Sequence, residues 1–155
     1  MNWAHAHLIV NHVPVMGAVF AVLLLIAGMG KNSPDMQQAA LWGLFLTALA
    51  AGVAYFTGSY AGDLVQTLPG VSAARINTHE DAALLAMIAA IATGVLAAVG
   101  LVLGRMKARV PRWCVLGCLL LGLGTCALMA RAANLGGEIR LPEARSGFQF
   151  PVPHA

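Results

Sequence analysis

Apolar residues dominate four long stretches of the chain, which run roughly over residues 8–29, 38–58, 82–104 and 113–133. Each stretch is close to the ~20 residues that an α-helix needs to cross the hydrocarbon core of a bilayer. A helix pairs its backbone groups within itself, whereas an open strand would leave them unpaired in lipid. The pattern therefore predicts an all-α integral membrane protein with four transmembrane helices.

Polar segments that contain proline or glycine separate these stretches. The segments 30–37 and 105–112 are short, so the helices on either side of each are predicted to be antiparallel neighbours, while the connection 59–77 is longer. The chain is thus expected to form a single four-helix membrane bundle over residues 1–155. Both termini should lie on the same side, and the residues 138–155 should form an extended tail.

Local signals predict where two of the helices begin or end. Thr78 is expected to cap the third helix, which would place His79 at its N-terminus. Gly136 and Gly137 are expected to end the fourth helix, because glycine adopts the left-handed conformation that often follows a helix.

The composition supports a membrane location. Hydrophobic residues make up 59% of the chain and charged residues only 10%, whereas a soluble domain has about 25% charged residues. The formal net charge of +3 does not indicate nucleic-acid binding, because the basic residues are few and no aromatic residues are interleaved with them. The positions of the basic residues are more informative about orientation.

Basic residues predict which side of the membrane each end of the bundle faces. Those next to the two short connections are Lys31, Arg105, Lys107, Arg109 and Arg112. An excess of lysine and arginine marks cytoplasmic loops. Both termini and the long connection are therefore expected on the outer side, which is the periplasm for a protein of a bacterial inner membrane.

Histidines gather at the outer end of the predicted bundle. His5, His7 and His12 stand at the mouth of the first apolar stretch, and His79 opens the third. Ionisable side chains at the edge of the hydrocarbon are costly to place and are usually functional. Their clustering predicts a bound haem or metal ion. The competing interpretation is that they only hydrogen-bond to water, headgroups or backbone at the interface.

One hypothesis assigns His12 and His79 as the axial ligands of a b-type haem between the first and third helices. His12 is the deepest of the N-terminal histidines, and Met16 follows it one turn further along the same face. His5 and His7 are then expected nearer to solvent, beside the haem propionates.

Further residues are expected to contribute to the site, whether it binds a haem or a metal ion. Arg131 reaches the same side and is expected to pair with a haem propionate, or else with Glu80 or Asp81. The alternative to haem is a copper or zinc ion held by the same four histidines, with Glu80 nearby.

Catalytic chemistry is not indicated for the chain on its own. The sequence has no nucleophile elbow, no zinc-protease motif and no phosphate-binding loop. No catalytic residue is therefore assigned. If the chain takes part in catalysis, we expect it to do so as a subunit of an oxidoreductase.

Two end motifs resemble those of a family of small bacterial four-span membrane proteins of unknown function. The first is the His-x-His-x4-His-x-Pro motif from His5 to Pro14, and the second is the Asn-x-Gly-Gly-Glu-Ile-Arg segment from Asn134 to Arg140. This resemblance covers nearly the whole chain and implies functional positions in both segments and at His79. The general plan is also similar to that of membrane b-type cytochromes, in architecture alone.

The leading hypothesis is a haem-b-binding subunit that transfers electrons at the outer face of the membrane. Its expected partners are a larger redox complex or further copies of the chain, together with a quinone or a periplasmic cytochrome. Because all candidate ligands lie on one side, one chain could not carry electrons across the bilayer alone. The alternatives are a non-catalytic accessory or assembly subunit, and a membrane protein that binds copper or zinc.

Overall fold

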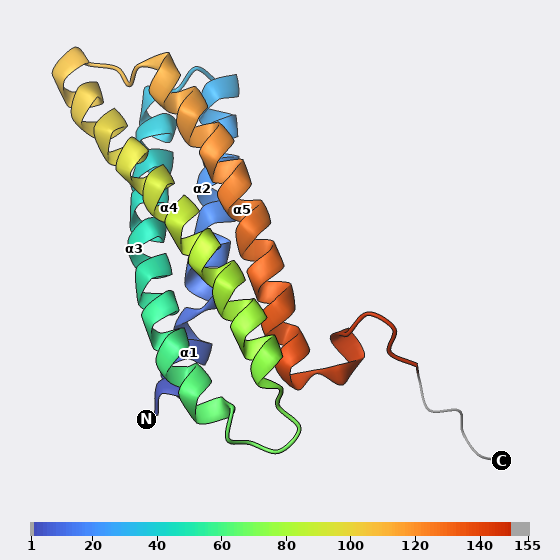
Figure 1. The fold of residues 1–155 in the computed structure, drawn as a ribbon. Coiled ribbons are helices and arrows are strands. Elements are labelled where there is room, and N and C mark those ends of the chain that lie inside the picture. Colours follow the sequence, from blue (N-terminus) through green and yellow to red (C-terminus); the bar gives the residue numbers. More distant parts are fainter. Residues whose placement is uncertain (1, 150–155) are drawn as a thin grey trace.

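Five α-helices and one short 3₁₀ helix follow one another along residues 2–149, which are the residues that the computed structural model describes (Figure 1). Their bounds are α1 Trp3–Val10, α2 His12–Gly30, α3 Pro34–Val65, α4 Ala73–Lys107, α5 Arg112–Arg140 and η1 Pro142–Ala144. When α1 and α2 are counted as one segment, four helical segments are long and apolar enough to cross a membrane. The chain is therefore a multi-pass membrane protein with four candidate spans, as the apolar pattern predicts.

Pro14 explains why the first span consists of two helices. Proline has no backbone N–H, so it cannot donate to the carbonyl of Val10 four residues before it. The helix is interrupted at Asn11, between α1 and α2. The two helices nevertheless continue one another as a single segment, Trp3–Gly30.

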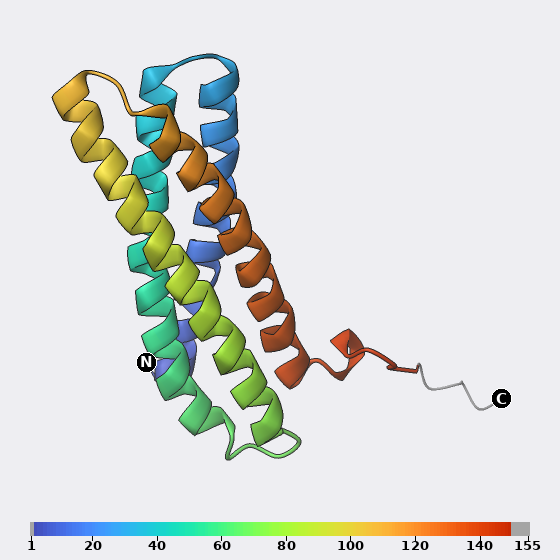
Figure 2. The ribbon, with the colours of Figure 1, turned by 45° about the horizontal axis from the view of Figure 1, so that its top comes forward.

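Neighbours in sequence pack against each other as an antiparallel bundle. The helix α2 packs on α3, α3 on α4 and α4 on α5, and α5 returns to contact α2. The start of α1 and the end of α5 lie at the same end of the bundle, as Figures 1 and 2 show. The predicted all-α fold with antiparallel neighbours is confirmed.

The buried core changes in character along the bundle. The half that contains the two short connections is filled by large side chains and cysteines, among them Leu25, Leu41 and Cys118. The half that contains the termini is filled mainly by alanines, including Ala18, Ala86 and Ala132. Small residues let helix backbones approach closely inside a membrane.

Two predicted helix ends are wrong. The helix α4 begins at Ala73, so Thr78 lies inside it and its hydroxyl donates to the carbonyl of Ala74 at 2.8 Å. His79 is therefore in the second turn of α4 and not at its N-terminus. The helix α5 continues through both glycines to Arg140. The extended tail predicted from residue 138 accordingly begins only after α5 and η1, and the residues 150–155 lie outside the described part.

Gly94 provides a test of how closely α3 and α4 approach. A Cβ atom at Gly94 would overlap the side chain of Ala48 on α3, whereas a Cβ at Gly124 on α5 would meet nothing within 4 Å. We expect Gly94→Ala to lower the free energy of unfolding by about 1–3 kcal/mol, the usual cost of overpacking. Thermal unfolding in detergent measures this cost. Equal stability of Gly94→Ala and the control Gly124→Ala would contradict the close packing.

Candidate functional site

Two histidines on different helices bind backbone carbonyls of a neighbouring helix in the same way. The Nδ1 atom of His7 lies 3.0 Å from the carbonyl oxygen of Ala54 on α3. The Nδ1 atom of His79 lies 2.9 Å from the carbonyl oxygen of Ala132 on α5. A carbonyl only accepts, so Nδ1–H is the donor in both pairs. In the neutral form each ring therefore keeps a lone pair on Nε2.

A glycine makes room for each imidazole. A Cβ atom on Gly58 would lie 2.9 Å from Cε1 of His7, and a Cβ atom on Gly136 would lie 3.0 Å from Cε1 of His79. Each glycine comes four residues after the alanine whose carbonyl accepts the hydrogen bond. Any larger residue would push the ring away from that carbonyl. This contact, and not a helix end, explains the glycine at position 136.

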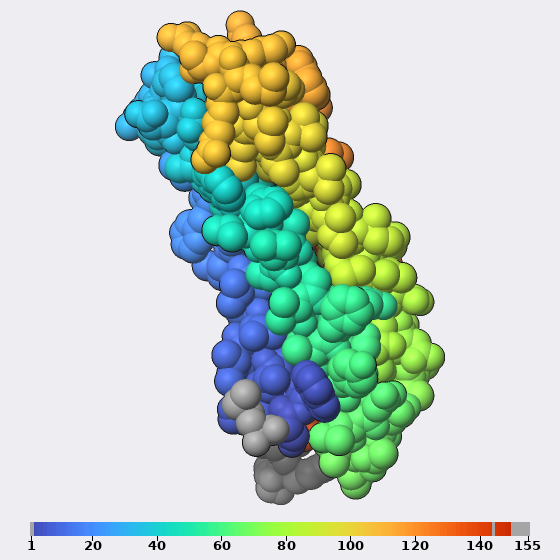
Figure 3. All heavy atoms as spheres, turned by 90° about the vertical axis from the view of Figure 1, so that its left-hand side faces the viewer, coloured from blue at the N-terminus to red at the C-terminus, as the bar shows by residue number. Residues whose placement is uncertain are grey.

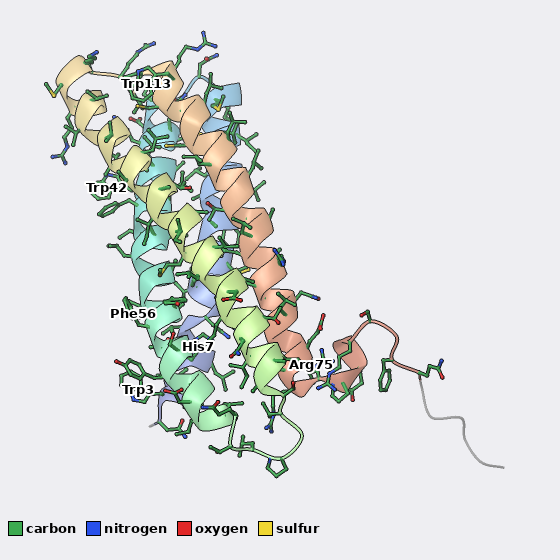
Figure 4. All side chains as sticks on the ribbon, viewed as in Figure 1. Trp3, His7, Trp42, Phe56, Arg75 and Trp113 are labelled. Atoms are coloured by element: carbon green, nitrogen blue, oxygen red, sulfur yellow. The ribbon has the colours of Figure 1, made fainter. Side chains whose placement is uncertain are left out.

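The two histidines come from helices that lie diagonally across the bundle. His7 is on α1 and His79 is on α4, and neither α1 nor α2 packs against α4. Both side chains are half-buried. Within residues 2–149 no hydrogen-bond partner is found for either Nε2 atom. Figure 4 shows His7 in the half of the bundle that holds both chain ends.

Within the described residues α1 packs against only part of the bundle. The helix α2 packs on α5 in both halves: Ala18 shares a buried cluster with Met129 and Ala132, and a Cβ atom on Gly122 would meet the side chain of Val22 at 2.8 Å. In the histidine half α1 contacts α3 and α2, but neither α4 nor α5. In Figures 1 and 2 the lower end of α5 accordingly stands apart from α1.

Other residues predicted for the site lie further out. His5 and His12 are exposed, and the side chain of Met16 is 50% exposed. Arg131 is also exposed, while Glu80 is half-buried against Gly62 of α3. In the described part of the chain, no three His, Cys, Asp or Glu side chains form a group that could hold a metal ion. The four histidines are thus not gathered around one point, and the two that are half-buried and hydrogen-bonded to a neighbouring helix are His7 and His79.

Asn11 is a polar residue of this region that the sequence did not single out. Its Oδ1 atom is buried and has no hydrogen-bond partner among residues 2–149. It lies four residues after His7, in the interruption between α1 and α2. A buried amide oxygen without a donor is costly. The spacing of four from His7 inside an apolar stretch is the signal that could have identified it.

Polar contacts at the end of α5 hold the His79 side of the site. Arg75 of α4 forms an ion pair with Glu138 of α5 at 3.3 Å, and the side chain of Asn134 donates to the same carboxylate at 3.0 Å. Arg145 donates to the carbonyl of Glu138 at 3.0 Å, so the segment after α5 folds back on its last turn. These contacts give the Asn134–Arg140 segment a structural role next to Gly136. Figure 4 shows Arg75 at this end of α5.

Comparison with known proteins adds no family to this description. No protein-family model, no curated protein and no solved structure matches the chain. The resemblance of the two end motifs to a bacterial four-span family therefore stays a prediction. The geometry itself defines a four-helix membrane protein with a pair of half-buried histidines at one end of the bundle.

The glycines test the two histidine contacts directly. In ¹⁵N-histidine NMR spectra we expect His7 and His79 to show the tautomer protonated at Nδ1, because each Nδ1–H donates to a carbonyl. Gly136→Ala should move the His79 resonances, since a Cβ there would meet the ring at 3.0 Å. Gly137→Ala is the control, because a Cβ at Gly137 would meet nothing within 4 Å. If both variants left the His79 signals unchanged, the contact with Gly136 would be wrong.

Proposed function

We propose that the chain binds a b-type haem between His7 and His79 and transfers electrons at the histidine end of the bundle. The observation that carries this proposal is the hydrogen bond from each Nδ1–H to a backbone carbonyl. Histidines that bind a metal usually donate their other ring N–H in this way, which fixes the tautomer and the orientation of the ring. The Nε2 atom of each ring is left without a hydrogen-bond partner among the described residues.

The surroundings of the pair suit a flat group. The neighbouring core is built mainly from buried alanines, such as Ala51, Ala82 and Ala86, so no large side chain stands among them. The helix α1 makes no contact with α5. When bound, a haem supplies a one-electron redox centre whose potential depends on its axial ligands and its burial.

Several residues of the chain have assigned roles in this proposal. His7 and His79 replace the pair His12 and His79 that the sequence favoured, because His12 is exposed and His7 is half-buried. The hydrogen bonds to the carbonyls of Ala54 and Ala132 would fix the orientation of the two rings toward a metal. Arg131, which is exposed, remains the candidate partner of a propionate.

The one-sided site limits what the chain can do. A single redox centre near one end of the spans can exchange electrons with a quinone or an external carrier, or with a larger partner complex. It cannot pass electrons across the bilayer by itself. We therefore propose an electron-transfer subunit that works with a redox partner and has no catalytic reaction of its own.

Visible absorption of the purified protein and of four variants tests the haem and its ligands. We expect a Soret band that shifts on reduction with dithionite. His7→Ala and His79→Ala should each abolish this band, because an axial ligand is lost. His5→Ala and His12→Ala are the controls and should keep it, since both side chains are exposed. Loss of the band in His12→Ala together with its retention in His7→Ala would replace our ligand pair with the one that the sequence favoured.

If the purified protein is colourless, elemental analysis distinguishes the metal-binding alternative from the accessory or assembly subunit. Copper or zinc found by elemental analysis, and lost in His7→Ala and His79→Ala, would favour a metal-handling protein. Protein without colour and without bound metal would leave the accessory or assembly subunit and would refute both kinds of site.

The orientation of the histidine end is part of the proposal. Five of the nine basic residues lie at the opposite end, together with one acidic residue, Asp35. Basic residues are concentrated in cytoplasmic loops. We therefore expect alkaline phosphatase fused to the C-terminus to be active in a bacterial host and a fluorescent protein fused there to be dark. The reverse pattern would place the histidine end in the cytoplasm.

A further inference from the structure

A second candidate site lies at the end of the bundle away from the histidines. A cavity of about 300 Å³ opens between the connection from α2 to α3 and the start of α5. Asn32, Arg109 and Arg112 line its polar part, while Met29, Val115 and Leu116 line its apolar part. In Figure 3 the end of α4 and the connection to α5 form the top of the molecule, with the turn between α2 and α3 beside them.

The two arginines at this cavity are free to bind an anion. Arg109 and Arg112 are both exposed, and neither has an ion pair or a hydrogen bond through its side chain to any other residue between 2 and 149. Asp35, at the start of α3, is the one acidic residue of the sequence at this end. An unpaired guanidinium presents a planar set of donors that matches phosphate oxygens.

The backbone adds to the positive potential of the cavity. The helices α3 and α5 both begin next to it. In α5 the first backbone N–H that donates to a carbonyl, that of Pro111, belongs to Cys114. The preceding amides of Arg112 and Trp113 therefore have no acceptor within the described residues. Helix N-termini favour anions through such amides and through the helix dipole.

Two further features favour a lipid as the source of the anion. Leu116 lines the cavity and is 46% exposed, and Trp113, one turn earlier, is 59% exposed. Tryptophan is enriched where a membrane protein crosses the headgroup region. Figure 4 shows Trp113 at this end of the bundle. An apolar surface thus leads from the cavity to the lipid-facing side of α5, where acyl chains lie.

We propose that this cavity binds the phosphate of an anionic phospholipid through Arg109 and Arg112, with the acyl chains along Leu116 and the neighbouring surface of α5. Basic pockets between transmembrane helices recognise acidic headgroups in this way. The site is independent of the histidine pair, because it lies at the other end of all four spans. It anchors the end of the bundle that carries most of the basic charge.

Native mass spectrometry of the protein in detergent tests this site, with phosphatidylglycerol and phosphatidylcholine as the probes. We expect preferential retention of phosphatidylglycerol. The double variant Arg109→Gln/Arg112→Gln should bind it roughly 25-fold more weakly, about fivefold for each basic residue lost. Arg112→Lys keeps the charge but loses the planar donors, so we expect intermediate binding.

The matched control is Arg105→Gln/Lys107→Gln, which removes two charges from the same end at positions that do not line the cavity. It should leave phosphatidylglycerol binding nearly unchanged. An equal loss in the control, or equal retention of phosphatidylcholine, would show general attraction and overturn the site. Displacement of the lipid by glycerol phosphate alone, at equal concentration, would overturn the role of the acyl chains. Circular dichroism shows whether each variant is folded, and Arg112→Lys tests the site if the double variant is not.

Discussion

The hydrogen bond from an imidazole Nδ1–H to a helical carbonyl is the interaction on which the histidine end depends. In a helix that carbonyl already accepts the N–H of the residue four positions later, so the imidazole must approach its second lone pair from the side. A side chain on that later residue would block the approach, which is why Gly58 and Gly136 stand where they do. Polar groups without partners are costly in the membrane, so each ring is held firmly once it is paired.

The same interaction occurs once in each half of the chain. The α1–α3 pair holds His7, and the α4–α5 pair holds His79. Because the two pairs pack side by side through α3 and α4, the histidines come from diagonal helices at the same end of the bundle. The interruption at Asn11 and the alanine core distinguish this end from the other, whose core contains larger side chains.

The apolar pattern predicted the four spans, their antiparallel order and the shared side of the histidines, because hydrocarbon thickness and backbone pairing leave few alternatives. Helix ends were predicted less well. The signals at Thr78 and Gly136 resemble caps, but neither is one: α4 begins six residues before His79, at Ala73, and Gly136 lies against the His79 ring.

Which N-terminal histidine is half-buried could not be predicted from the spacing of the histidines in the sequence. Depth along the chain favoured His12, but the face of the helix that meets α3 is the one that carries His7. Which face is buried depends on the rotation of the helix and on the interruption at Asn11. Hydrophobic residues cover every face of this helix, so the sequence does not indicate which face is buried. The Ala-x-x-x-Gly spacing on α3 and α5 becomes informative only when a histidine is known to lie opposite it.

Electron paramagnetic resonance of the purified, oxidised protein tests the central claim most directly. Two imidazoles on one haem iron give a low-spin ferric spectrum, and this is the result that the His7–His79 pair predicts. A high-spin ferric spectrum would show that one of the two positions is not a ligand. Purified protein that contains no haem iron would contradict the proposed site altogether.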